Sequence, residues 1–329
     1  EVFGERRAVS LDVSKKHVLD DRGETYRYEK LLLATGGSPN RLAESCAGVI
    51  YYRTLADYRR LRELCAQHNH FIVVGGSFIG AELAAALALQ EKHVTMVFPE
   101  AGIGATVFPD GLSDAVTRLY RKRGVDVQPG SSVARAEEHD GACRVILESG
   151  QSLDAPAVVA GLGIAPNNTL AAESGLETGD GIVVDEMLRT SHPDVYAAGD
   201  VASFHAPALD RWLRVEHEDN ALSMGRAAGC NMAGGEKPYT HLPCFYSDLF
   251  DLGYEAVGLT DARLETESLW LEPFRKGIVV YLDVDRVVGV LFLNEWDKVP
   301  AGRELIEAGG AVSRSDLKDW CNERLSDSQ

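Results

Sequence analysis

The spacing of hydrophobic positions changes character several times along the chain. Residues 1 to 30 alternate apolar and polar positions around turn signals such as Asp21-Arg22-Gly23, which is typical of a small antiparallel meander. A short apolar run, Leu31 to Leu33, follows and ends in a Gly-Gly-x-Pro turn. Between residues 54 and 67 the apolar positions recur at helical spacing, which predicts an amphipathic helix. Its apolar face comprises Leu55, Tyr58, Leu61 and Leu64.

The stretch from Phe71 to Leu89 carries the strongest pattern in the chain. Residues 71 to 74 are apolar and partly β-branched, as in a buried parallel strand, and residues 81 to 89 have the Ala and Leu content of a helix packed on a sheet. The Gly-rich turn between them places a dinucleotide's pyrophosphate at the positive end of the helix. Gly75 permits the tight turn, and Gly80 lets the helix lie close to the strand. The predicted cofactor-binding residues of the turn are Gly75, Gly76, Ser77, Ile79 and Gly80, with Ser77 replacing the middle glycine of the G-x-G-x-x-G pattern.

The acidic residue that follows the next apolar run supports this interpretation. A second short strand, residues 93 to 98, is followed by Pro99 and Glu100. A carboxylate at this strand end binds a ribose 2′-OH and repels a 2′-phosphate. Because no Arg stands immediately beside Glu100, we expect NAD(H) rather than NADP(H). The alternative is a structural glycine turn followed by a solvated glutamate.

The rest of the chain alternates strands and helices up to about residue 240, and aromatic-rich alternating strands follow from Leu242. A strand that begins at Val195 delivers the pair Gly199-Asp200 to a sheet edge. A closing helix is predicted to start near Ser315. The other predicted elements are helices at 112–123 and 216–232, strands at 125–127, 183–185, 255–259, 277–282 and 287–293, a hairpin at 143–153, and a strand from residue 158 that leads into a Gly/Pro turn.

Composition narrows the classes of function. A length of 329 residues suggests about two domains, and 45% apolar with 25% charged residues is ordinary globular composition. The net charge of −17 argues against nucleic acid as a partner, and no apolar run approaches the ~20 residues of a membrane span. The first residue is Glu1 rather than Met, so we expect a fragment or a processed product.

The cysteines indicate the compartment. They show neither a C-x-x-C motif nor metal-ligand spacing, so no metal site is predicted and the thiols are interpreted as buried or idle in a reducing compartment. We therefore expect a cytoplasmic protein, with the mitochondrion as the alternative. The six cysteines are Cys46, Cys65, Cys143, Cys230, Cys244 and Cys321.

Three landmarks stand in one order: Ala34-Thr35-Gly36, the turn from Gly75 to Glu82, and Gly199-Asp200. That order resembles the FAD/NAD(P)-dependent pyridine nucleotide-disulfide oxidoreductase superfamily. The local match is closest to the apoptosis-inducing factor-like flavoproteins, and pieces of it run over nearly the whole chain. The matching stretches are residues 11–13, 28–30, 34–37, 98–100, 215–217, 237–239, 245–248 and 253–255.

The resemblance implies an α/β fold with tandem dinucleotide-binding, Rossmann-like domains. In this arrangement an FAD-binding domain, residues 1–40 and 164–240, is interrupted by an NAD-binding domain, residues 41–163. An α+β interface-type domain, residues 241–329, follows. The family's FAD lobe begins with its own Gly-rich strand-turn-helix, which we expect to precede residue 1.

The resemblance also implies roles for single residues. Asp200 corresponds to the residue that hydrogen-bonds the FAD ribityl chain, with Gly199 making room for it; the alternative is a surface turn. Phe78 matches the aromatic residue that covers the nicotinamide face opposite the flavin, and a core phenylalanine under the turn is the alternative. Glu82 matches an acid near the nicotinamide amide.

The remaining implied cofactor contacts come from the later part of the chain. Glu216 and His217 open the predicted helix at 216–232, whose N-terminus would stabilise negative charge on a reduced flavin. A histidine that serves only the helix start is the alternative for His217. Tyr246 stands where the family often has a Trp at the flavin. The other implied contacts are Arg53, for which a solvated side chain is the alternative, Gly163, Glu218, Glu255 and Asn294.

The implied chemistry is hydride transfer from the nicotinamide to the flavin, which needs no protein acid, base or nucleophile, so no catalytic residue is predicted. One hypothesis is an FAD-dependent NADH oxidoreductase that passes electrons to a ferredoxin, a rubredoxin or a quinone. The other is a weakly catalytic, NADH-sensing interaction protein that forms a homodimer when NADH binding produces a flavin–NAD charge-transfer complex. A third interpretation is that this chain is an inactive, truncated form of such a protein. A dithiol-disulfide reductase is a poor alternative, because no His-x-x-x-x-Glu pair follows His241.

Overall fold

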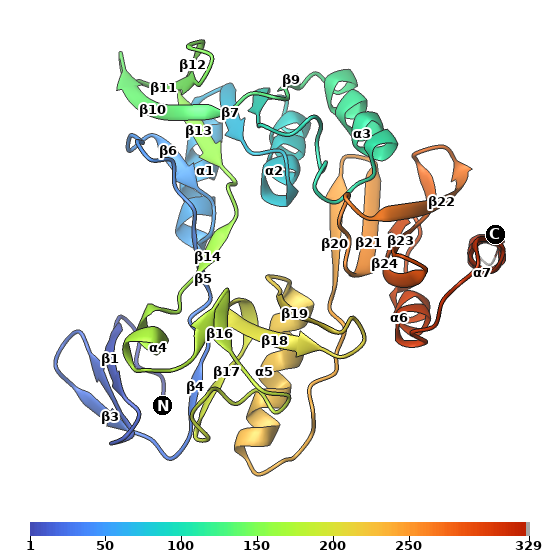
Figure 1. The fold of residues 1–329 in the computed structure, drawn as a ribbon. Helices are drawn as coiled ribbons and strands as arrows, with labels where there is room; N and C mark the ends of the chain where they lie inside the picture. The colour runs from blue at the N-terminus through green and yellow to red at the C-terminus, as the bar shows by residue number, and fades with distance from the viewer. Residues whose placement is uncertain (327–329) are drawn as a thin grey trace. The chain divides into compact units, whose positions relative to one another are not determined.

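A computed structural model describes residues 1–326 of the chain (Figure 1). The chain divides into two compact units, and each unit is built from two separate stretches of sequence. The first unit contains residues 1–38 and 165–245, and the second contains residues 39–164 and 246–329. Two short strands, β5 (Gly37–Pro39) and β14 (Ile164–Pro166), carry the chain across the boundary. The three domains expected from the sequence stay a prediction.

The first unit begins with the predicted antiparallel meander, which is confirmed. It consists of β1 (Ala8–Asp12), β2 (His17–Asp20) and β3 (Thr25–Arg27). The apolar run that follows forms β4 (Leu31–Leu33), which pairs in parallel with β17 (Val195–Ala197).

A four-stranded sheet and two helices complete this unit. Strand β17 leads directly into a 3-10 turn, η1 (Gly199–Val201), which contacts helix α5 (Glu218–Met232). The predicted helix start at Glu216 and His217 is wrong by two residues, because His217 keeps an extended backbone and is the N-cap of α5. The other elements are α4 (Thr169–Glu173), β15 (Thr178–Gly179), β16 (Gly181–Val183), β18 (Ala202–Ala206) and β19 (Arg211–Arg214).

The second unit is organised on a five-stranded parallel sheet in the order β6-β13-β7-β8-β9. Its central strand is the predicted buried run, of which Phe71 to Val74 are at most 3% exposed. Parallel neighbours require crossover connections, which α2 (Phe78–Leu89) and α3 (Asp110–Lys122) supply. The strands are β6 (Val49–Tyr51), β7 (His70–Val74), β8 (His93–Val97), β9 (Asp126–Gln128) and β13 (Ala157–Ala160).

Helix α1 (Leu55–Gln67) forms where its apolar spacing predicts, and Thr54 caps it in a capping box with Asp57. Its apolar face is only partly buried, however. Leu61 is buried, whereas Leu55 is 61% exposed and Tyr58 is 41% exposed. The helix contacts β6, which is the edge strand of the sheet, and it lines a pocket together with α2.

An antiparallel meander packs against one side of the parallel sheet. It consists of β10 (Val133–His139), β11 (Ala142–Leu147) and β12 (Ser152–Ala155). The predicted hairpin corresponds to β11 and β12, while β10 is not apparent in the hydrophobic pattern. Buried residues of the meander, among them Cys143 and Val145, share one core with Ile72 and Val158 of the sheet.

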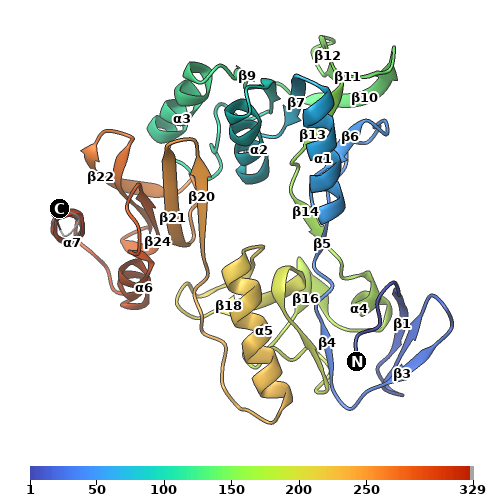
Figure 2. The same cartoon turned by 180° about the vertical axis from the view of Figure 1, so that it is seen from behind.

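The last part of the second unit is a five-stranded sheet in the order β20-β21-β24-β23-β22. Helix α6 (Val299–Glu307) contacts β21 and β24, and α7 (Arg314–Ser326) contacts β22 (Figure 2). The predicted strands at 255–259, 277–282 and 287–293 and the closing helix are confirmed. The sheet comprises β20 (Cys244–Leu249), β21 (Leu252–Gly258), β22 (Glu265–Glu272), β23 (Lys276–Asp283) and β24 (Arg286–Leu293).

Candidate dinucleotide-binding site

The turn between β7 and α2 has no room for side chains at two of its glycines. A Cβ on Gly75, whose φ is +117°, would lie 2.3 Å from the carbonyl oxygen of Gly161. A Cβ on Gly80 would lie 2.1 Å from the carbonyl oxygen of Gly75. The predicted steric roles of Gly75 and Gly80 are therefore confirmed: the turn is tight, and helix and strand approach backbone to backbone.

The middle of the turn suits an anionic ligand. A Cβ on Gly76 would lie 2.6 Å from the ring of Phe98, so only glycine fits there without a shift. Ser77 is the N-cap of α2, and its side chain makes no capping hydrogen bond. The helix begins at Phe78, three residues earlier than predicted, so Ile79 and Gly80 lie in its first turn. The N-terminal N–H groups and the helix dipole are thus at the turn, where a pyrophosphate would fit.

Glu100 lies at the same edge of the sheet as this turn. Strands β7 and β8 are parallel neighbours, so their carboxyl ends meet there, and the Gly-rich turn and Glu100 follow those two ends. The side chain of Glu100 is half-buried, and its carbonyl oxygen accepts a hydrogen bond from Gly130 N–H at 2.9 Å. A contact of Glu100 with a ribose stays a prediction.

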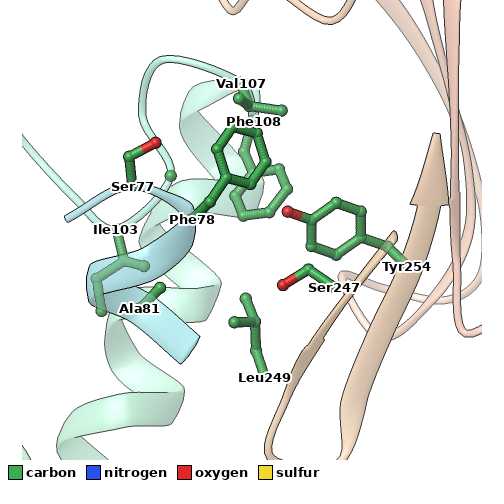
Figure 3. Close-up of a pocket in the computed structure, with 10 residues that line it drawn as sticks. Ser77, Phe78, Ala81, Ile103, Val107, Phe108, Ser247, Leu249 and Tyr254 are labelled. Carbon is green, nitrogen blue, oxygen red and sulfur yellow. The ribbon is translucent and has the colours of Figure 1, made fainter. Parts of the chain in front are cut away.

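A small pocket of about 250 Å³, including space open to solvent, adjoins the start of α2. Figure 3 shows Phe78 and Phe108 on one side of the pocket and Tyr254 and Ser247, from β21 and β20, on the other. Phe78 is half-buried rather than part of the core. It therefore presents an aromatic surface where a nicotinamide ring is expected.

Glu82, one turn into α2, is held by the C-terminal sheet. The hydroxyl of Ser247 donates to Glu82 Oε1 at 2.5 Å. The side chain of Glu82 keeps access to solvent, yet desolvation by the surrounding protein raises the pKa of its carboxyl group. The hydrogen bond from Ser247 opposes this shift, and the charge of Asp248 adds to it.

The first unit brings other predicted residues together around the start of α5. Gly199 has a φ of +76°, and its N–H donates to the sulfur of Met224 in α5 at 3.3 Å. The ring of His217 stacks on Phe245 with centroids 4.4 Å apart and planes 18° apart. Burial lowers the pKa of His217 to about 4, against the opposing charges of Asp219 and Asp200. Gly199-Asp200 and His217 thus lie in one neighbourhood, and their contact with FAD stays a prediction.

Residues that flank His217 are engaged in polar contacts within the first unit. Glu216 accepts a hydrogen bond from Arg214 at 2.7 Å, and Glu218 is exposed in the first turn of α5. Asp219 accepts from His241 at 2.6 Å and from the Cys244 N–H at 3.0 Å. Asp219 therefore fixes His241 and the first residue of β20, Cys244, a role that the sequence did not suggest.

Two predicted cofactor contacts use their polar atoms within the protein. The carboxylate of Glu255 accepts from the N–H groups of Lys298 and Val299 at 2.5 and 3.0 Å, so it caps the start of α6. The side-chain oxygen of Asn294 accepts from Gly253 N–H at 2.8 Å, and its amide donates to the carbonyl of Arg275 at 2.9 Å. Cofactor contacts for Glu255 and Asn294 stay predictions.

Three further predicted residues of the second unit are exposed. Tyr246 is 67% exposed, Arg53 is exposed just before α1, and Gly163 is exposed with a φ of +75°. The N–H of Arg53 donates to Asp57 at 3.2 Å. All three are accessible to a ligand, and their contact with a cofactor stays a prediction.

Residues that sequence reasoning did not single out contribute to the site. Gly161 follows β13 and meets the Gly-rich turn through its backbone. Ser247 and Tyr254 line the pocket beside Phe78. Both stand within the stretches 245–248 and 253–255 that carried the family resemblance, so a signal for them existed, although their contact with α2 could not be foreseen.

Neither a metal centre nor a membrane span is found in the described part of the chain. Within residues 1–326, no three His, Cys, Asp or Glu side chains are grouped so that they could hold a metal ion. In the same range, no helix combines the length and apolar character needed to cross a bilayer.

Comparison with known proteins identifies the family. Residues 1–225 match the family described as pyridine nucleotide-disulphide oxidoreductase, and residues 228–273 match the C-terminal domain of mitochondrion-associated apoptosis-inducing factor. The chain therefore belongs to the pyridine nucleotide-disulphide oxidoreductase family, whose members use FAD and a nicotinamide nucleotide. This confirms the class of oxidoreductase, the two cofactors and the apoptosis-inducing factor-like character that the resemblance implied.

Individual relatives agree with this assignment. The chain is 36% identical over 92% of its length to a Dictyostelium discoideum protein named apoptosis-inducing factor 1, mitochondrial, and it spans 61% of that protein. It is 32% identical over 89% of its length to putidaredoxin reductase of Pseudomonas putida, of which it spans 72%. In a solved complex of putidaredoxin reductase with putidaredoxin, the matched chain has a TM-score of 0.89 at 29% identity, covering 98% of this chain and 80% of that one. This similarity supports the tandem α/β fold.

Proposed function

We propose that this protein is an FAD-dependent NADH oxidoreductase that delivers electrons to a small iron–sulfur protein of the ferredoxin or rubredoxin type. The observation that carries the proposal is the Gly75–Gly80 turn, closed backbone to backbone, with Phe78 at a pocket that is also lined by Ser247, the hydrogen-bond partner of Glu82. The chemistry that FAD would supply when bound is uptake of a hydride from NADH and release of single electrons. The chain's residues supply binding, orientation and electrostatics.

The nucleotide half of NADH is held at the edge of the parallel sheet. The N-terminal end of α2 and the Ser77 hydroxyl bind the pyrophosphate. Glu100 accepts hydrogen bonds from the adenosine ribose, and its negative charge disfavours a 2′-phosphate. NADH is accordingly the preferred donor.

The reactive half is oriented by residues of α2 and the C-terminal sheet. The ring of Phe78 covers one face of the nicotinamide, which leaves the other face for the flavin. Glu82, kept in place by Ser247, accepts a hydrogen bond from the carboxamide. The pocket thus selects one face of the nicotinamide by packing and one rotation of the ring by hydrogen bonding.

In the first unit, the residues assigned to FAD lie around the start of α5. Asp200 binds the ribityl chain, and His217 at the start of α5 contacts the ring system. Because His217 has a pKa of about 4, it is neutral at pH 7 and brings no positive charge. The partial positive charge that favours a reduced flavin comes instead from the N-terminus of α5. Arg53, Tyr246, Glu255 and Asn294 are further proposed contacts.

The names of several relatives support a protein acceptor. One relative is named rubredoxin-NAD(+) reductase, and another is the ferredoxin–NAD(+) reductase component of an anthranilate 1,2-dioxygenase system. They are 32% identical to this chain over 76% and 95% of its length, respectively. We therefore place a quinone acceptor second. The cytoplasmic location, with its mitochondrial alternative, stays a prediction.

The match of residues 228–273 to the apoptosis-inducing factor domain favours one second candidate. In this alternative the protein turns over slowly, and NADH produces a long-lived flavin–nicotinamide charge-transfer complex that promotes a homodimer. The two candidates share their cofactors and differ in acceptor turnover and oligomeric state.

The test begins with the purified chain, reconstituted with FAD and mixed anaerobically with NADH in a stopped-flow spectrometer. We expect the flavin absorbance to bleach, and we expect steady turnover when a ferredoxin or rubredoxin is added. A persistent long-wavelength band, little turnover and an NADH-dependent increase in sedimentation coefficient would favour the second candidate. If FAD and NADH both fail to bind, both candidates are wrong for this chain.

A matched pair of glycine variants links the activity to the turn. In Gly76→Ala the new methyl group meets the Phe98 ring, and we expect at least tenfold weaker NADH binding. Gly310→Ala has no atom within 4 Å of the new Cβ and is the control. Equal NADH affinity in the two variants would contradict the assignment of the turn.

A further inference from the structure

Two cysteine thiols that are 97 positions apart in sequence meet inside the second unit. The sulfur atoms of Cys46 and Cys143 lie 3.0 Å apart, and either thiol can donate to the other. Cys143, on β11, is 1% exposed and belongs to the core shared by the meander and the parallel sheet. Cys46 lies in the segment before β6, is partly buried and packs against that core.

The backbone around both residues is anchored, so the two sulfurs are held together by the fold. The carbonyl of Cys46 accepts from Val49 N–H at 3.2 Å in a turn. The carbonyl of Glu44 accepts from Ala136 N–H on β10 at 3.0 Å, which ties this segment to the meander. The turn passes close to Cys143, since a Cβ on Gly48 would lie 3.2 Å from the Cys143 Cβ.

We propose that Cys46 and Cys143 form a redox-active dithiol that low-molecular-weight disulfides convert reversibly into an intramolecular disulfide. A disulfide bond is about 2.05 Å long, so closure needs the sulfurs to approach by about 1 Å. None of the predicted FAD or NAD contacts is part of this pair. The site therefore adds to the proposed function and does not depend on it.

The reaction balances with one external disulfide, RSSR. The Cys46 thiolate attacks one sulfur of RSSR, forms a mixed disulfide and releases one RS⁻, which takes up a proton. The Cys143 thiolate then attacks the Cys46 sulfur of the mixed disulfide and releases the second thiol. Two protein thiols are oxidised to one disulfide, and RSSR is reduced to two RSH.

The two cysteines have different parts in this exchange. Cys46 is accessible to a small reagent, whereas Cys143 is not. Burial raises the pKa of the Cys143 thiol to about 12, so its thiolate is scarce, and Cys143 reacts only with the Cys46 sulfur that the fold holds 3.0 Å away, which is the second, intramolecular step. Cys46 is the attacking residue and Cys143 the resolving one.

The disulfide would tie the segment that precedes β6 to the meander strand β11. It would close a long loop, because the two residues are 97 positions apart. Closing such a loop restricts the unfolded chain, so oxidation should raise the Tm by several degrees, and a reducing agent should return it to its starting value.

The test treats the folded, full chain with oxidised glutathione, blocks free thiols with N-ethylmaleimide in denaturant, and digests the protein with trypsin without reduction. Each cysteine lies in a separate tryptic peptide, residues 42–53 and 136–144. We expect these two peptides to be joined, with two of the six cysteines no longer available to N-ethylmaleimide. Dithiothreitol should separate them.

Variants decide between this pair and random oxidation. Cys46→Ser and Cys143→Ser should each abolish the joined peptide and the rise in Tm, while Cys230→Ser, which alters an exposed cysteine of α5, should keep both. The proposal is overturned if Cys230 is glutathionylated while peptides 42–53 and 136–144 stay separate. It is also overturned if Cys46 stays a mixed disulfide with glutathione, or if joined peptides involve all cysteines equally.

Discussion

Ser247 and Glu82 are 165 positions apart, and the hydroxyl of Ser247 donates to the carboxylate of Glu82 at 2.5 Å. Ser247 belongs to β20 and Glu82 to the first turns of α2. A side chain of the C-terminal sheet therefore sets the position and the acidity of a carboxylate next to the dinucleotide turn. This hydrogen bond makes the C-terminal sheet part of the nicotinamide site in the proposed function.

The Ser247→Ala variant tests this coupling. In the unmodified protein the hydrogen bond from Ser247 lowers the pKa of Glu82. Ser247→Ala removes this hydrogen bond, so the pKa of Glu82 should rise. We expect the acid limb of kcat/KM for NADH to move to higher pH and KM to rise about three- to tenfold near pH 6. Steady-state kinetics over pH 5 to 8 measure both. Ser152→Ala, at an exposed position of β12, should match the unmodified protein.

Glu100 should decide between the two nicotinamide nucleotides. The Glu100→Gln variant keeps the size of the side chain and removes the charge that repels a 2′-phosphate. We expect the ratio of kcat/KM for NADH to that for NADPH to fall about tenfold. Glu148→Gln, at an exposed position after β11, is the control for net charge. An unchanged ratio in Glu100→Gln would place ribose recognition elsewhere.

His217 should make the stability of the fold depend on pH in acid. Its pKa is about 4 in the folded protein, below the ordinary value of 6.5, so between these pH values the unfolded chain binds a proton that the folded chain does not. The contribution of His217 to the free energy of unfolding is therefore fully present above pH 6.5, and it is lost as the pH falls towards 4. Compared with His217→Gln, the unmodified protein should lose about 1 to 3 kcal/mol more between pH 7 and pH 4.5.

Urea unfolding curves at the two pH values measure this difference. His205→Gln, which alters an exposed histidine of the same unit, should keep the pH dependence of the unmodified protein. Parallel pH dependence in His217→Gln and the unmodified protein would show that His217 is not buried as a neutral ring.

Glu255 is predicted to stabilise α6 whether or not it also touches a cofactor. Glu255→Ala removes the acceptor for the N–H groups of Lys298 and Val299, so the free energy of unfolding should fall by about 1 to 2 kcal/mol. Chemical denaturation measures this loss, with Glu272→Ala on an exposed position of β22 as control. A changed flavin affinity in Glu255→Ala, measured by fluorescence titration, would support the additional cofactor contact.

Short-range patterns predicted much of the fold. The local sequence from Phe71 to Gly80 is enough to predict its structure, because strand, turn and helix follow one another within a few residues. The sequence pattern places the start of α2 three residues too late, because Phe78 and Ile79 are not strong helix formers. In the structure the helix begins at Phe78, and Gly80 in its first turn packs closely against Gly75.

Long-range contacts set the limit of the sequence analysis. The partners Ser247 and Glu82, and likewise Cys46 and Cys143, meet only because separate strands and loops come together in the folded unit. The same limit applies to α1, where helical spacing alone could not indicate that Leu55 faces solvent at the sheet edge. A family resemblance assigns a role to a sequence position. It does not predict that the carboxylate of Glu255 caps the start of α6.

Asn40 hydrogen-bonds the point where the chain enters the predicted NAD-binding domain to the point where the chain leaves it. Its backbone N–H donates to the carbonyl of Gly163 at 2.9 Å, and its side-chain amide donates to the carbonyl of Leu162 at 3.1 Å. A lobe whose ends meet in this way can be inserted into a host chain without stretching it. The predicted NAD-binding domain therefore leaves and rejoins the rest of the chain at one place, so a domain with another nucleotide preference could be spliced in at these two points, provided that it keeps a partner for Ser247 at the position of Glu82.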